Sequence, residues 1–184
     1  MTGIRYQTVG PDDSLQRAAA RHPAVDTGAV GLYAGFSRLR DRLAELEEDF
    51  LTTHGITPGR FTVLRYLTEE DAECLKPSDL ASKSGVTRAT ITGLLDTLER
   101  DDLIRRQSDQ ADRRVTRVSA TPNGRALIQK LMPEYLSMIS TVAEKLSGPE
   151  RDAFIHLCNG LEQGSRVAEK RYIHSSESPA GPQR

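Results

Sequence analysis

The sequence predicts a mainly α-helical protein with one small β-hairpin. Two short helical segments meet at Gly85, which is the arrangement of a helix-turn-helix. Two short runs follow that are typical of strands, 103–106 and the Val- and Thr-rich 115–119, and they indicate the hairpin, or wing. Long segments with helical apolar spacing flank this region on both sides. The predicted fold class is therefore α+β, a winged helix-turn-helix with helical dimerisation arms.

The composition indicates an elongated protein whose core is partly completed by a partner. A chain of 184 residues fits one domain, or one domain with an oligomerisation arm. The hydrophobic content of 37% and the mean hydropathy of −0.49 are low for a compact monomer of this size. No apolar run is long enough to span a bilayer, and the first residues lack the features of a signal peptide. We therefore expect a cytoplasmic protein with no membrane partner.

Charge is unevenly distributed along the chain, although the formal net charge is only −1. Residues 1–75 carry 8 Lys/Arg and 12 Asp/Glu, and residues 126–184 carry 7 of each. The segment 76–125 carries 10 Lys/Arg against 7 Asp/Glu. This local basic excess, rather than the whole-chain charge, is what an anionic partner such as nucleic acid would meet.

Apolar spacing and turn residues divide the chain into five segments. The dimerisation seam of the first long helix has apolar residues at alternating steps of four and three, namely Leu32, Phe36, Leu39, Leu43, Leu46 and Phe50. The predicted segments are an N-terminal extension with room for one short helix (1–26), an N-terminal dimerisation helix (27–55), the winged helix-turn-helix (56–120), C-terminal dimerisation helices (121–173) and a flexible tail (174–184).

Threonine residues mark three helix starts. Thr57 and Thr121 each precede a proline, and Thr87 opens the second helix of the helix-turn-helix. The helix after Thr121 is expected to run to about Leu146 and to kink or loosen by one turn at Pro133.

The segment "SDLASKSGVTRATITGLLDTLERDDLIRRQSDQADRRVTRVSATPNGRAL" resembles the winged helix-turn-helix of MarR-type bacterial transcriptional regulators. The most specific parts are "SGVTRATIT" with "LLDTLERDDLI", followed by "DRR" and "TPNGRAL". The likeness covers roughly residues 28–172. It implies a homodimer that binds a pseudo-palindromic operator in double-stranded DNA, usually as a repressor released by a small-molecule or redox signal.

Three positions depart from the family pattern. Asp102 stands where the family usually has glycine, and Ala120 replaces a usual leucine. Aspartate tolerates the left-handed backbone that such a position requires, so the first change costs little. Gly93 lies within the recognition helix, costs about 1 kcal/mol relative to alanine and removes a side chain that could contact a base.

The start of the second helix of the helix-turn-helix presents short polar and basic groups, as a helix entering the major groove should. An arginine can contact guanine with two hydrogen bonds, and hydroxyls can bind phosphates or base edges. Alternatively, Thr87 is only a helix cap and Arg88 only a solvated charge. The DNA-binding candidates here are Ser84, Thr87, Arg88, Thr90 and Thr92.

The wing offers a second DNA contact. An arginine over a narrow minor groove gains from the concentrated negative potential, and Asp112 can orient such a guanidinium. We expect Arg113 or Arg114 to enter the groove, with Arg106 near phosphates and Arg117 a phosphate contact or plain surface charge. The alternative is a solvated hairpin with local ion pairs.

The resemblance places an effector between the dimerisation arms and the winged helix. The residues there suit an aromatic or phenolic carboxylate, although each could instead be a surface arginine or a tyrosine at the edge of the core. The candidates are Tyr33, Arg38, Arg40, Arg60 and Tyr66.

Other function classes have little support. The chain shows no nucleotide-binding glycine loop, nucleophile elbow or metalloprotease motif, so we expect neither an enzyme nor a cofactor. The two cysteines, Cys74 and Cys158, and the scattered histidines form no metal-ligand spacing. Two alternatives remain, a winged helix used for protein–protein contact and a redox-responsive regulator acting through Cys74.

Overall fold

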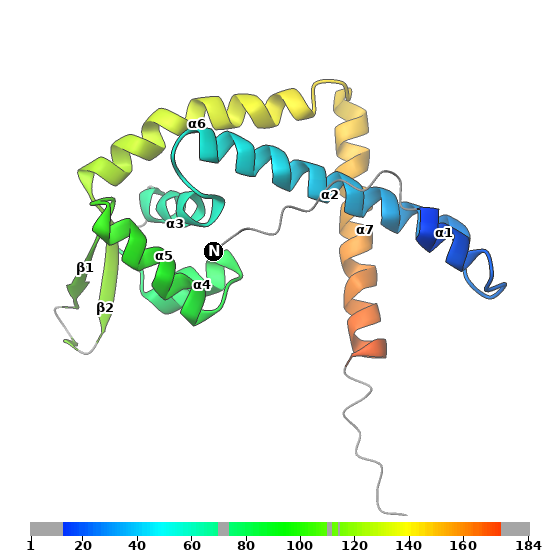
Figure 1. The fold of residues 1–184 in the computed structure, drawn as a ribbon, viewed down its shortest axis with the longest axis horizontal. Coiled ribbons are helices and arrows are strands. Elements are labelled where there is room, and N and C mark those ends of the chain that lie inside the picture. Colours follow the sequence, from blue (N-terminus) through cyan, green and yellow to red (C-terminus); the bar gives the residue numbers. More distant parts are fainter. Residues whose placement is uncertain (1–12, 70–73, 110–111, 114, 174–184) are drawn as a thin grey trace, which may run out of the picture. The chain divides into compact units, whose positions relative to one another are not determined.

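The computed structural model describes residues 13–69, 74–109, 112–113 and 115–173. Its contacts divide the chain into two units, residues 1–132 and 133–184. The elements, labelled in Figure 1, are α1 (Asp13–Ala19), α2 (Thr27–Thr53), α3 (Pro58–Thr68), α4 (Pro77–Ser84), α5 (Arg88–Arg100), β1 (Ile104–Ser108), β2 (Thr116–Ala120), α6 (Pro122–Val142) and α7 (Gly148–Tyr172). The predicted class, mainly helical with one hairpin, is confirmed.

Helix α3 lies at the centre of the first unit. It contacts α2, α4, α5 and β2. Phe61, Leu64 and Leu67 recur at the spacing of one helical face and are at most 1% exposed. Burial of a side chain of this size stabilises the fold by roughly 1.5–3 kcal/mol. The other large buried side chains of this core are Leu51, Val63, Leu80, Ile91, Leu95, Leu98, Ile104, Val118 and Leu131.

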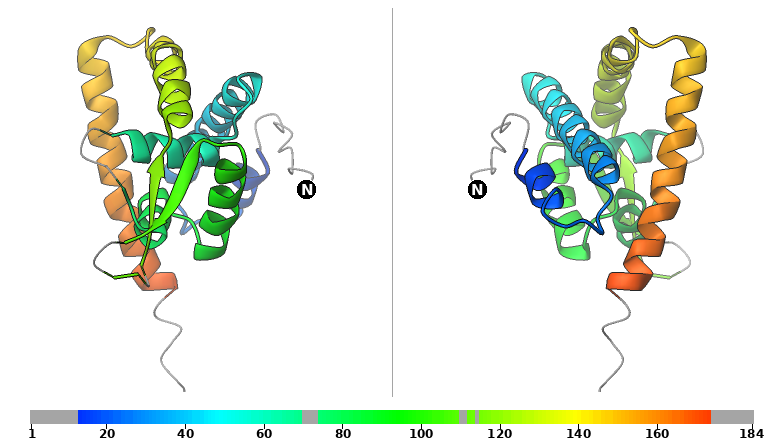
Figure 2. Two further views of the ribbon diagram at one scale, coloured as in Figure 1. Left: turned by 90° about the vertical axis from the view of Figure 1, so that its left-hand side faces the viewer. Right: turned by 90° about the vertical axis from the view of Figure 1, so that its right-hand side faces the viewer.

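Strands β1 and β2 form an antiparallel hairpin (Figure 2) with Ile104 opposite Ala120 and Ser108 opposite Thr116. Leu75 adds a single bridge to the outer edge of β2, through two backbone hydrogen bonds of 2.9 and 2.8 Å with Val118. The hairpin was predicted at this place, but both strands begin one residue later than expected, and β1 is one residue longer. The extended residues before α4 therefore join the hairpin to the helix-turn-helix.

The turn between α4 and α5 follows the predicted chemistry. Gly85 has φ of +64°, a left-handed conformation that glycine adopts without steric cost. Thr87 caps α5 by accepting a hydrogen bond from the backbone of Thr90 at 3.1 Å. These two residues fix where the recognition helix begins.

The first residues of α6 and its cap form hydrogen bonds with Asp102, which ends the turn after α5. Asp102 has φ of +55°, and its carbonyl accepts the Thr121 hydroxyl at 2.7 Å. Thr121 in turn caps α6 by accepting the Gly124 N–H at 3.1 Å, and Asn123 donates to the Asp102 carboxylate at 2.7 Å. We call these four residues, Asp102, Thr121, Asn123 and Gly124, the latch.

Helix α6 is shorter than predicted. It passes through Pro133 without a break and ends at Val142 rather than near Leu146. At the end of α6 the backbone hydrogen bonds span three residues instead of four, as from the Ala143 N–H to the Ser140 carbonyl at 3.1 Å. Such tighter bonds are common in the last turn of a helix. Ser147 and Glu150 then form a capping box at the start of α7.

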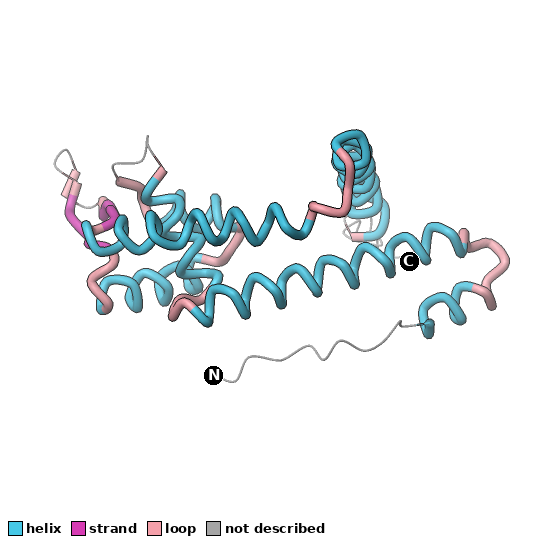
Figure 3. The backbone as a smooth tube through the Cα atoms, turned by 90° about the horizontal axis from the view of Figure 1, so that it is seen from above, coloured by secondary structure: helices cyan, strands magenta, loops and turns pink. Residues whose placement is uncertain are grey.

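The long helix α2 follows α1, and the two helices are in contact, as Figure 3 shows. Only Ala34 and Leu51 are buried among its 27 residues, so most of the predicted seam is exposed. Within the described part of the chain, no helix is both long and apolar enough to cross a membrane.

Replacing Gly124 should destabilise the protein, because a Cβ at this position would lie 2.1 Å from the Leu103 carbonyl oxygen. We expect Gly124→Ala to lower the free energy of unfolding by about 1–3 kcal/mol or more, measured by urea denaturation.

Gly93→Ala is the matched control. No atom lies within 4 Å of a Cβ placed there, and the site is within α5, so this change should raise stability by up to about 1 kcal/mol. Equal stability changes in the two variants would show that the close approach at Gly124 is not a constraint.

Candidate nucleic-acid interface

Helix α5 separates an apolar face from an exposed polar face. Ile91, Leu95 and Leu98 are at most 1% exposed and pack in the core. Four of the predicted contact residues lie exposed at the N-terminal end of the helix or its cap: Thr87, Arg88, Thr90 and Thr92. The structure therefore brings these four together on one accessible surface.

The hydroxyls on this surface keep hydrogen-bonding capacity for a ligand. Thr87 Oγ1 and Thr90 Oγ1 lie 2.9 Å apart. The hydrogen bond between them uses one of the two hydroxyl hydrogens, so the second hydroxyl hydrogen can be donated to a phosphate. Thr92 donates to the Arg88 carbonyl at 2.8 Å, so its oxygen is left as an acceptor. An acceptor suits an amino group of adenine or cytosine better than a phosphate.

Two arginines of the predicted interface have no counter-ion. Arg88 and Arg113 are both exposed, and neither forms an ion pair with another residue that the structure describes. Asp112 is exposed and its backbone N–H donates to Asp109 at 3.2 Å, which forms the turn at the wing tip. Arg114, the other predicted groove-entering residue, lies outside the described residues.

Ser84 corrects one expectation. Its Oγ is buried and has no hydrogen-bond partner among the described residues. The hydroxyl faces the protein at the end of α4, because the neighbouring Leu80 and Ala81 hold this helix against the core. In this conformation the Ser84 side chain does not present a polar group to DNA.

Arg106 has a different role in the structure from the predicted phosphate contact. Its guanidinium binds Glu99 at 2.9 Å and Asp96 at 2.7 Å, both on α5. Glu99 also accepts the Arg106 backbone N–H at 3.0 Å. Arg106 therefore fastens the wing to the recognition helix and offsets one of the two negative charges there, and its contact with phosphate stays a prediction.

Arg117 pairs with Asp109 across the base of the wing tip, with Nε 2.7 Å from Oδ2. This hydrogen bond raises the pKa of the Arg117 guanidinium above its usual value. The pair holds the two strands together near the tip, which favours a structural role over a free surface charge.

Two of the five predicted ligand residues bond to a neighbouring helix or its cap. Arg60 is 17% exposed and forms an ion pair with Asp101, the C-cap of α5. The Tyr66 hydroxyl donates to the Lys83 carbonyl at 2.9 Å, which ties α3 to the end of α4. Each side chain thus bonds its helix to a neighbouring element of the helix-turn-helix, although Arg60 Nε is buried without a hydrogen-bond partner among the described residues.

The other three lie exposed on α2. Arg40 binds Asp41 at 2.9 Å, and Tyr33 is 64% exposed. Arg38 is also exposed. A ligand role for these five residues stays a prediction.

The two cysteines differ in exposure. Cys74 is exposed and Cys158 is half-buried. No group of His, Cys, Asp or Glu residues that could hold a metal ion occurs in the part of the chain covered by the structure.

The residues that sequence reasoning missed are the carboxylates that hold the interface in shape. Asp96 and Glu99 lie three positions apart on α5, a spacing that places them on one face. That spacing could have indicated one basic side chain bound by both carboxylates. Its identity, Arg106, depends on how the hairpin folds back against α5.

Comparisons with known proteins agree with this geometry. Residues 56–116 match the family described as MarR family. The chain is 32% identical over 143 residues to the HTH-type transcriptional repressor YetL of Bacillus subtilis, covering 78% of this chain and 86% of that protein. It is 33% identical over 140 residues to the HTH-type transcriptional regulator PapX of Escherichia coli, covering 76% and 79%.

Solved structures show the same fold. The MepR protein of Staphylococcus aureus in its DNA complex superimposes with a TM-score of 0.64 at 24% identity, over 70% of this chain and 94% of that one. A MarR family transcription regulator superimposes with a TM-score of 0.68 at 21% identity, over 76% and 93%.

Removing the Arg106 guanidinium should loosen the wing. We expect Arg106→Gln to lower the free energy of unfolding by about 1 kcal/mol, because its ion pairs are partly exposed and therefore screened. Arg100→Gln is the control. Arg100 is 74% exposed, and its Nε lies 3.8 Å from Asp101 Oδ1, which is a long and weak ion pair. If urea denaturation gives the two variants the same stability, Arg106 does not fasten the wing.

Proposed function

This chain belongs to the MarR family of DNA-binding transcriptional regulators, and we propose that it is a homodimeric repressor that binds a pseudo-palindromic operator and is released by a small-molecule effector. The single observation that carries the DNA part is the exposed start of α5, where Arg88 has no counter-ion among the described residues. The relatives are regulators rather than enzymes.

The recognition helix and the wing supply two kinds of contact in this proposal. Thr87, Arg88, Thr90 and Thr92 enter the major groove, where arginine and hydroxyl groups contact base edges and phosphates. Arg113, beside the neighbouring Arg114, approaches the adjacent minor groove or its phosphates. The ion pairs of Arg106 with Asp96 and Glu99 support this arrangement, because they offset one of the two negative charges on α5 and so lessen its repulsion of DNA.

Apolar side chains left exposed on the long helices support the homodimer. On α2 these include Leu32, Phe36, Leu39 and Leu43, each at least 38% exposed. Helix α7 has no buried residue, although Phe154, Leu157 and Leu161 lie on one face of it. A second copy of the chain is the partner that the family implies. The two recognition helices would then meet major grooves about one turn, roughly 10 bp, apart.

The effector is proposed to be a small aromatic or phenolic acid. A structural relative, BpsR of Bordetella bronchiseptica, has its DNA binding regulated by 6-hydroxynicotinic acid according to its description. Aromatic acids that bind this chain should shift its dimers toward a state that no longer fits the operator. If no member of a panel of such acids weakens operator binding, the aromatic effector is wrong.

Operator binding should depend on salt and on Arg88. With a duplex selected by the protein from a random library, log K should fall steeply with log salt concentration. Arg88→Ala should weaken binding to the selected duplex by about 1–3 kcal/mol and relax its sequence preference.

Lys145→Gln removes an exposed charge from the segment after α6 and is the control, with an expected effect near zero. Affinity that barely changes with salt would contradict the DNA role and favour a winged helix that contacts protein.

Dimerisation should depend on the apolar face of α7. We expect Leu161→Glu to shift the protein toward monomers in analytical ultracentrifugation, because a charge buried in an apolar interface loses its hydration. Gln163→Glu adds the same charge on the opposite face of α7 and should leave the dimer intact. A Leu161→Glu protein with an unchanged dimer constant would exclude this face from the interface.

A further inference from the structure

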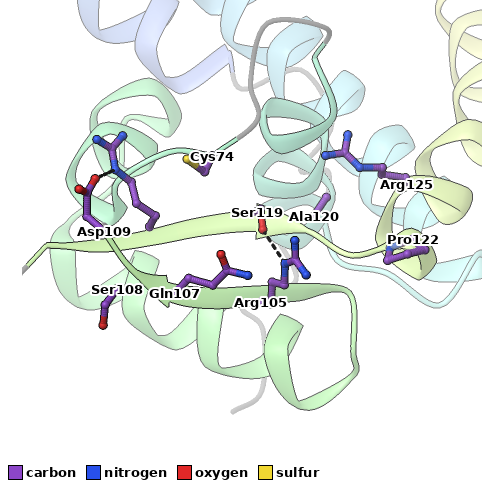
Figure 4. A pocket seen from close by; sticks show the side chains of 10 residues that line it. Cys74, Arg105, Gln107, Ser108, Asp109, Ser119, Ala120, Pro122 and Arg125 are labelled. Atoms are coloured by element: carbon purple, nitrogen blue, oxygen red, sulfur yellow. Dashed lines mark hydrogen bonds and ion pairs between the residues drawn. The ribbon is translucent and has the colours of Figure 1, made fainter. Parts of the chain in front are cut away.

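A groove of about 850 Å³ lies on the outer face of the wing, away from the residues expected to sense an effector. Its lining includes Cys74 before α4, Arg105 and Gln107 of β1, Arg117 and Ser119 of β2, and Arg125 of α6 (Figure 4). Cavities of about 300–1,000 Å³ hold small molecules, so the size is sufficient for one. None of the five predicted ligand residues lines this groove.

Strand register explains why these side chains share one face. Arg105 lies opposite Ser119, and Gln107 lies opposite Arg117. Successive side chains of a strand point to opposite faces, so Arg106 lies on the other face, where it binds Asp96 and Glu99 of α5. The groove therefore opens on the face of the wing turned away from those two carboxylates of the recognition helix.

The charges in the groove are incompletely balanced. Arg117 is paired with Asp109, which also lines the groove. Among the described residues, Arg105 forms no ion pair and donates from Nε to the neutral Ser119 hydroxyl at 3.2 Å. Arg125 is exposed and has no ion pair with any residue in the described ranges. Two guanidinium groups from different elements thus line one hollow, and neither forms an ion pair with a carboxylate of the described residues.

We propose that this groove is a binding site for a small, multiply charged anion bearing phosphate or carboxylate groups. Arg105 and Arg125 hold the charged groups, because a guanidinium binds phosphate or carboxylate through two parallel N–H bonds. The Gln107 amide and the Ser119 hydroxyl provide neutral hydrogen bonds beside them. The lining is too polar for the apolar body of a typical aromatic ligand, which favours a sugar phosphate, a nucleotide or a polycarboxylate.

The position of the groove connects such a ligand to the DNA-binding surface. An anion held by Arg105 of β1 and Arg125 of α6 would bridge the base of the wing and the start of the helix that follows it. This site adds a second ligand to the proposed effector response. It rests on the proposed function only for the claim that ligand binding changes DNA binding. Binding of the anion itself is a property of the free protein and is measured without DNA.

Calorimetry with inorganic pyrophosphate tests the site, with citrate as the carboxylate arm and ionic strength held constant with sodium chloride. We expect saturable binding of one pyrophosphate or citrate per chain. The double variant Arg105→Gln/Arg125→Gln should bind at least about tenfold more weakly. Lys130→Gln removes an exposed α6 charge outside the groove and should bind as the parent protein does.

Cys74 gives a second readout within the same chain. A ligand in the groove should slow the alkylation of Cys74 by iodoacetamide, followed by peptide mass spectrometry, and Cys158 on α7 is the internal reference. If the double variant does not fold by circular dichroism, Arg125→Gln alone replaces it, because that side chain has no ion pair to lose among the described residues.

Three outcomes would overturn the proposal. One is the absence of saturable binding with both pyrophosphate and citrate, and another is binding that the double variant retains. The third is a double variant that loses affinity for a long duplex while neither anion binds the parent protein, which would assign the groove to flanking DNA. Failure of operator binding with intact anion binding would instead overturn the proposed function and leave this site standing.

Discussion

The constraint on which the rest of the structure depends is the latch between the end of the α5 turn and the start of α6. Asp102 takes a left-handed backbone, its carbonyl accepts the Thr121 hydroxyl, and the Leu103 carbonyl accepts the Thr121 N–H at 3.1 Å. Gly124 is required there because any Cβ would collide with Leu103. The chain enters the hairpin just after Asp102 and leaves it just before Thr121. The latch therefore fixes the base of the wing relative to the recognition helix. A short sequence, "TPNG", thereby sets how the wing is joined to the helix that is proposed to face DNA.

Ion pairing then sorts the basic side chains of the wing and α5 into two groups. Arg106 and Arg117 are bonded to carboxylates and hold the wing together and against α5. Arg88 and Arg113 have no such partner within the described ranges and remain for an external anion. This division is what lets a chain of net charge −1 present a local surface suited to DNA.

Local sequence was sufficient to predict most elements of the fold, and tertiary contacts account for what it missed. The helix starts at Thr87 and Thr121 follow from capping chemistry within a few residues, and both were confirmed. The partners of Arg60 and Tyr66 lie 41 and 17 positions away in the chain, so no local pattern could show that these side chains join helices. The burial of the Ser84 hydroxyl likewise depends on how α4 packs. Sequence reasoning therefore found the accessible residues of α5, but not which polar groups the fold had already engaged.

Hydrogen–deuterium exchange of the full chain, free and bound to a duplex that it selects from a random library, tests most directly whether the latched α5 and wing bind DNA as one surface. The predicted result is slower amide exchange in residues 87–93 and in the wing segment 105–118 on DNA binding, with α1 unchanged. Slower exchange that is confined to other elements, with α5 and the wing unaffected, would contradict it.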